Sequence, residues 1–190
     1  MNVIETKRWC ENCPLRLYNT KGYSLSGTGT PYHKLLIIVP NVDYIAYKNK
    51  DMSFSSQVDI IKEVFSSTGV LEPTIYIVPL IRCNENISCN VNEDVINRCL
   101  NYTNRDITVY GFTRILVLGN AVKRLLQCNI KDNIDTYFDF KHFIVEVNYA
   151  PLVKYTDKDL YDIFKRKLIT WYNESINNVY TNKKIIRTYD

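Results

Sequence analysis

The chain has 190 residues, of which 46% are hydrophobic and 23% are charged, and its formal net charge is +4. This composition is ordinary for a soluble globular protein, and the mild positive charge permits an anionic partner without demanding one. The longest apolar run, KLLIIVP, is too short to span a membrane, and the start has no apolar signal-peptide segment. We therefore expect an intracellular protein that lies in the cytoplasm or the nucleus. The host cell of a virus is one such setting.

Apolar runs and helical spacing alternate along the chain. Buried strands are predicted over 34–40, 74–81, 114–118 and 143–147. Amphipathic helices are predicted over 55–69, 92–104, 119–127 and 156–176. The alternation predicts an α/β fold: one three-layer α/β/α domain over 1–190 around a central, mostly parallel four-stranded sheet. The basic end, 177–190, is expected to be a flexible tail.

Four of the six cysteines form two spaced pairs. Cys10 and Cys13 make a C-x2-C pair near the start, Cys83 ends the second predicted strand, and Cys99 lies in the next helix. In a reducing compartment such cysteines are more often metal ligands than disulfides. Four thiolates suit a zinc ion or a [4Fe–4S] cluster, and the spacing by itself favours zinc. Alternatively, Cys83 and Cys99 bind no metal and are simply small hydrophobic side chains of the core.

The order of motifs separates these alternatives. The opening C-x2-C-P-L is followed by GTGTPYHKLLIIVP, a small-residue turn that leads into a strand. Next come a strand that ends in Arg82-Cys83, Cys99 in the following helix, the segment RILVLGNAVKRLL, and VEVNYAPL. In this order the motifs resemble the iron–sulfur (family 4) uracil-DNA glycosylases over about residues 8 to 170. The resemblance implies a uracil-DNA glycosylase-like fold and a [4Fe–4S] cluster, in preference to zinc, on the four cysteines.

The same resemblance places the family's catalytic positions on residues that lack the required chemistry. Pro40 stands at the first glycine of the water-positioning loop, which leaves Asn41 and Asp43 as weak candidates to position water. Ala150 stands where a histidine would donate a hydrogen bond to the departing base, a loss of about 100- to 1,000-fold in rate. Pro79 replaces the asparagine that would read the base edge. The resemblance therefore predicts a catalytically degenerate glycosylase.

The residues that the resemblance leaves for nucleic-acid binding are aromatic, apolar or basic. They are Tyr44, Phe54, Arg82, Leu152, Lys48 and Lys50. The rings would stack on bases, the leucine would wedge into a base stack, and the cations, with those of the C-terminal segment, would contact phosphates. We expect an accessory factor in viral or cellular DNA replication, transcription or repair. Its partners would be single-stranded or uracil-containing DNA and a polymerase or another replication or transcription subunit.

Two other functions remain open. One is an active glycosylase for uracil or another damaged base, in which Asn41 or Asp43 positions the water. The other is a protein–protein adaptor on the same fold, which the fifteen tyrosines favour because aromatic residues are enriched in interface cores.

Overall fold

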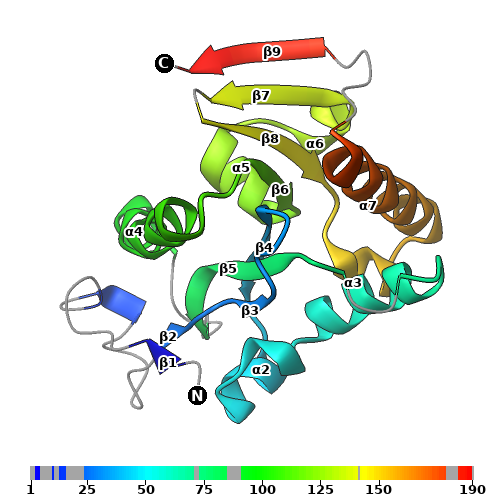
Figure 1. Ribbon diagram of the computed structural model, residues 1–190. Helices are drawn as coiled ribbons and strands as arrows, with labels where there is room; N and C mark the ends of the chain where they lie inside the picture. Colours follow the sequence, from blue (N-terminus) through cyan, green and yellow to red (C-terminus); the bar gives the residue numbers. More distant parts are fainter. Residues whose placement is uncertain are drawn as a thin grey trace.

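The computed structural model describes residues 3–4, 10, 13–15, 24–70, 73–84, 91–140, 142–178 and 184–189. Within these ranges a seven-stranded mixed sheet has the strand order β3-β5-β4-β6-β8-β7-β9 (Figure 1). Its strands are β3 (Thr28–Gly29), β4 (Leu35–Val42), β5 (Tyr76–Asn84), β6 (Arg114–Leu118), β7 (Thr136–Phe140), β8 (Phe143–Asn148) and β9 (Lys184–Tyr189). A separate antiparallel pair consists of β1 (Val3–Ile4) and β2 (Ser24–Leu25).

The helices follow the strands in alternation. They are α2 (Tyr44–Asn49), α3 (Ser56–Ser66), α4 (Glu93–Tyr110), α5 (Asn120–Leu126), α6 (Ile130–Asn133) and α7 (Lys158–Asn177), with the short 3₁₀ helices η1 (Met52–Phe54) and η2 (Pro151–Tyr155). Asn92 begins α4 as predicted, since its side-chain oxygen accepts a hydrogen bond from the Val95 N–H at 3.1 Å. No described helix is both long and apolar enough to cross a membrane.

The four strands predicted from apolar runs are β4, β5, β6 and β8, and they lie side by side. β4 pairs in parallel with β5 and with β6, and β6 pairs in parallel with β8. The predicted α/β class is therefore confirmed. The predicted number of four strands was wrong, because β3 pairs antiparallel with β5, β7 pairs antiparallel with β8, and β9 pairs in parallel with β7. These outer strands are short or alternate polar with apolar residues, so no apolar run marks them.

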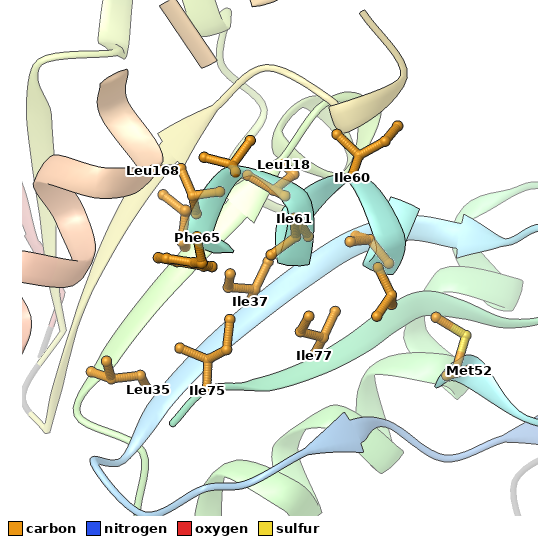
Figure 2. Packing of buried hydrophobic residues seen from close by; sticks show 14 of the residues in the cluster. Leu35, Ile37, Met52, Ile60, Ile61, Phe65, Ile75, Ile77, Leu118 and Leu168 are labelled. Atoms are coloured by element: carbon orange, nitrogen blue, oxygen red, sulfur yellow. The ribbon is translucent and has the colours of Figure 1, made fainter. Parts of the chain in front are cut away.

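The two faces of the sheet carry separate hydrophobic clusters. Alternate residues of a strand point to opposite faces, so Leu35 and Ile37 of β4 join one cluster while Leu36 and Ile38 join the other. Helices α3 and α7 cover the first face, and α4 and α5 cover the second (Figure 1). Figure 2 shows Ile61 and Phe65 of α3 packed over Ile37, with Leu168 of α7 beside them. The central strands are apolar throughout because both of their faces are buried.

The end of the chain differs from the expectation. A flexible tail was predicted over 177–190, but residues 184–189 form strand β9, which pairs with β7. The segment KIIRTY is rich in β-branched and aromatic residues, which favour a strand when an edge is available to pair with. The basic composition of this segment had suggested solvent exposure instead.

Candidate metal centre and binding face

The structure brings the four predicted metal ligands to one corner of the molecule. Cys13 and Cys99 are buried in the second hydrophobic cluster, and Cys83 packs against the same cluster. Cys10 joins them through a turn in which the Cys13 N–H donates to the Cys10 carbonyl oxygen at 3.2 Å. The Cys10 Sγ atom lies 3.4 Å from the Oη atom of Tyr102, a residue about one helical turn after Cys99. We call this region, together with the residues that surround it, the cysteine corner.

The corner arises because α4 packs against β5. Cys83 lies near the end of β5, and Cys99 lies on the buried side of α4. The five cysteines with described side chains form no disulfide. Within the described ranges, no three His, Cys, Asp or Glu side chains lie close enough together to hold one metal ion. The four thiols therefore share a region without forming a tight tetrahedron.

Burial favours the protonated form of the Cys99 thiol. Burial raises the pKa of the Cys99 thiol to about 11, while a hydrogen bond from the Arg82 backbone opposes the rise. Burial, followed by the hydrogen bond with Cys10, also raises the pKa of the Tyr102 hydroxyl. A cysteine binds metal as the thiolate, so a metal centre here would have to displace the Cys99 proton as it binds.

Arg82 is buried in an ion pair with Asp106, which argues against the phosphate contact predicted for this residue. Its side chain is buried, donates to Asp106 at 2.7 Å and to Thr103 at 3.3 Å, and stacks over the Tyr102 ring. The Arg82 Nε and Nη1 groups have no hydrogen-bond partner among the described residues. A buried cation beside Cys99 would offset the negative charge of a thiolate-bound metal centre.

The Asp43 side chain has a structural role in the loop after β4. Its Oδ1 atom accepts from the Ala46 N–H at 2.9 Å, which caps α2. Its Oδ2 atom accepts from the Ser55 hydroxyl at 2.7 Å and from the Ser56 N–H at 2.8 Å. Both oxygens are therefore engaged in joining α2 to the start of α3, which argues against Asp43 as the residue that positions water.

Asn41 lies at a bulge near the end of β4. The register of β4 against β5 shifts between Asn41 and Val42, and the Asn41 carbonyl oxygen accepts from the Gln57 side chain at 2.9 Å. The Asn41 residue is partly exposed. Because the bond to Gln57 uses the backbone of Asn41 and not its side chain, Asn41 is better placed than Asp43 to position a water.

The last part of β4 meets the segments that follow β6 and β8 at one point. A Cβ atom placed on Gly119 would lie 2.6 Å from the Ala150 Cβ and 3.3 Å from the Pro40 Cγ. Gly119 also has a φ of 56°, so both its backbone and its surroundings favour glycine. Pro40, Gly119 and Ala150 offer no side-chain hydrogen-bond donor, and the position predicted to have lost its histidine is lined by apolar atoms.

Large apolar side chains are exposed on the segments that follow β4 and β8 in the chain. Tyr44 of α2 is 67% exposed, Phe54 of η1 is 52% exposed and Leu152 of η2 is 41% exposed. Sequence reasoning predicted these three but missed Ile45 and Tyr155, which are exposed beside them in the same segments. The predicted Lys48 and Lys50 are also exposed, in and just after α2. We call these residues the carboxyl-end face, because their segments follow the carboxyl ends of β4 and β8.

Sequence reasoning also missed a cleft beside this face. A cavity of about 520 Å³ lies between Gly119, the end of α5, the start of α6 and Tyr149. Lys123 and Lys131 both line it. The signal that could have found it is the glycine turn directly after β6, because residues that follow a parallel strand gather at the carboxyl edge of the sheet.

No model of a known protein family matches this chain, and no curated protein is significantly similar to it. Its function is therefore inferred from its own strand order, cysteine positions and exposed surfaces.

Proposed function

We propose that this protein is an iron–sulfur, uracil-DNA glycosylase-like nucleic-acid-binding protein that has lost base-excision chemistry. It would act as an accessory factor in viral or cellular DNA replication, transcription or repair. The observation that carries the proposal is the meeting of Pro40, Gly119 and Ala150 at the carboxyl ends of parallel strands, with exposed aromatic side chains on the segments that follow β4 and β8.

The strand order supports a binding site at this position. The chain passes from β4 outward to β5 and then returns to β6 on the other side of β4, so the sheet has a switch point between β4 and β6. Open α/β sheets bind ligands outside the carboxyl ends of their strands at such a point. Pro40 and Gly119 lie there.

The chemistry at this point supports binding without catalysis. A glycosylase must donate hydrogen bonds to the departing base and must hold a water for attack on the sugar. Ala150 has no donor, and both carboxylate oxygens of Asp43 already accept hydrogen bonds from Ala46, Ser55 and Ser56. The exposed rings of Tyr44 and Phe54 keep the ability to stack on bases, which requires no particular sequence.

The cysteine corner supports the cofactor part of the proposal. Cys10, Cys13, Cys83 and Cys99 supply the four thiolates that a [4Fe–4S] cluster needs, with zinc as the alternative. When bound, the cluster would cross-link the N-terminal segment to β5 and α4.

The test is a single-turnover excision assay on anaerobically purified protein, in excess over uracil-containing single- and double-stranded oligonucleotides, followed by alkaline cleavage. We expect no base release, together with an oligonucleotide complex that weakens steeply as salt is raised. Asn41→Ala is compared with Asn101→Ala, which replaces an exposed asparagine on α4. Base release that Asn41→Ala abolishes and Asn101→Ala preserves would establish an active glycosylase and overturn the proposal.

The exposed apolar side chains favour one second candidate, a protein–protein adaptor. Ile45, Leu152 and Tyr155 would contact a protein partner as well as they would contact bases. If the purified protein binds no oligonucleotide at low salt, this second candidate replaces the first.

A further inference from the structure

The cleft between α5 and α6 has the dimensions and the lining of a ligand site. Its volume of about 520 Å³ falls within the range of about 300–1,000 Å³ that is common for small-molecule sites. It lies at the carboxyl edge of the sheet, where Gly119 follows β6 and Tyr149 follows β8. We call it the α5–α6 cleft.

The lining of the α5–α6 cleft suits an anion that carries a flat ring. Lys123 and Lys131 enter it from opposite helices, and the described residues that line it include no carboxylate. Asn120 adds a side-chain amide that can donate and accept hydrogen bonds. Tyr149 adds an aromatic ring. Two cations, an amide and a ring in one cleft match the phosphate, the base edge and the base plane of a nucleotide.

The cleft is continuous with the carboxyl-end face. Gly119 forms part of its wall and is in direct contact with Ala150, the residue immediately before η2. The same glycine lies against Pro40 in β4, the strand that leads to α2. A polynucleotide whose bases stack on the exposed rings of α2 and η1 would therefore meet the lysines of the cleft along the same edge of the sheet.

We propose that the α5–α6 cleft binds one nucleotide of a single-stranded DNA. Lys123 and Lys131 contact its phosphates, and its base lies against Tyr149. This inference rests on the proposed function, since it extends the path of the DNA beyond the carboxyl-end face. It assigns phosphate contacts to lysines of α5 and α6, whereas the sequence predicted them for Lys48 and Lys50 in and just after α2.

The experiment measures binding of fluorescein-labelled oligothymidylate to the intact protein by anisotropy over a series of salt concentrations. The test variant is Lys123→Gln/Lys131→Gln, and the matched control is Lys62→Gln, which removes an exposed lysine on the outer side of α3. Each lost phosphate contact lowers the slope of log affinity against log salt by about 0.7 for a single strand. We expect the double variant to lose about 1.4 from the slope and the control to lose nothing.

A second variant, Tyr149→Leu, separates the ring from the charges. We expect a loss of affinity of about 5- to 150-fold with the salt slope unchanged, because stacking releases no counterions. If wild-type protein binds the oligonucleotide and the double lysine variant keeps both its slope and its affinity, the cleft proposal is wrong and the proposed function stands. If wild-type protein does not bind at all, both are wrong.

Discussion

The cysteine corner and the carboxyl-end face belong to the same sheet and helices but differ in which side chains they bury. The corner buries polar groups, whereas the face exposes apolar ones. In the corner, polar groups are buried: the Arg82–Asp106 ion pair, the Cys99 thiol and the Tyr102 ring lie between β5 and α4. On the carboxyl-end face, apolar groups such as Tyr44 and Phe54 are exposed. Burying a charge costs free energy of folding, and exposing an aromatic ring forgoes the free energy that its burial would supply. We propose that a metal centre accounts for the first arrangement and a binding partner for the second, and the two proposals can be tested separately.

The largest effect is expected from removing a cysteine of the corner. We expect Cys99→Ala to lose its bound iron and to unfold, because metal binding and folding are coupled. Iron content and thermal unfolding are the measurements. Cys128→Ala is the control, since Cys128 is a partly buried cysteine outside the predicted ligand set. A soluble Cys99→Ala protein without iron but with the wild-type melting temperature would show that the corner needs no metal.

The next effect concerns the buried ion pair. Arg82→Met leaves the buried Asp106 carboxylate with only the half-exposed Arg105 guanidinium, 3.7 Å away, and we expect a loss near the lower end of about 3–5 kcal/mol in the free energy of unfolding. The double variant Arg82→Met/Asp106→Leu removes both charges and should recover most of that loss. Urea denaturation measures both variants.

The same double variant tests whether the positive charge of Arg82 also stabilises the proposed metal centre. If it does, the refolded double variant should bind iron more weakly than wild-type protein. Unchanged iron binding would restrict Arg82 to its pairing with Asp106.

A smaller effect is expected on the carboxyl-end face. Tyr44→Ala and Phe54→Ala should each weaken single-stranded DNA binding by about 5- to 150-fold. Both side chains are exposed, so we expect stability to change by no more than about 0.5 kcal/mol. The control is Tyr32→Ala, an exposed tyrosine just before β4 at the opposite end of that strand. Equal losses for Tyr32 and Tyr44 would remove the distinction between the two ends of the sheet.

The smallest effect is a loss of stability at alkaline pH from a tyrosine near the corner. Burial, followed by the charge of Asp106, raises the pKa of Tyr76 from 10.0 to about 12. The neutral phenol is therefore favoured in the folded state, and its stabilisation is complete below about pH 10 and disappears as the pH rises through about 12. We expect a loss of about 1.4 kcal/mol by about pH 11.

Urea denaturation at about pH 9 and about pH 11 checks this prediction. Tyr76→Phe should show a smaller fall in stability between the two values than the wild type, because it has no phenol to ionise at this position. All other ionisable groups are common to the two proteins, so the difference between them isolates the tyrosine. Parallel curves would mean that Tyr76 ionises with the same pKa in the folded and unfolded states.

The sequence by itself determined the central strands, the main helices and the ends of several helices. The apolar runs of β4, β5, β6 and β8 have no polar alternation because helices cover both faces, and this pattern is readable without coordinates. The Asn92 cap is local chemistry within one helical turn. The grouping of Cys83 and Cys99 followed from placing one on a strand and the other on the next helix.

Only the tertiary structure determined the features that depend on residues far apart in the chain, namely burial, hydrogen-bond partners, edge-strand pairing and the cleft. Arg82 precedes a predicted ligand at the end of a strand, and only the packing of α4 with Asp106 shows that its charge is buried. The carboxylate of Asp43 is engaged by Ser55 and Ser56, which are brought to it by the turn through η1. Strand β9 needed the edge of β7, and the α5–α6 cleft needed β8 to place Tyr149 beside α5. Local patterns specify elements, whereas burial, pairing and clefts arise only when those elements meet.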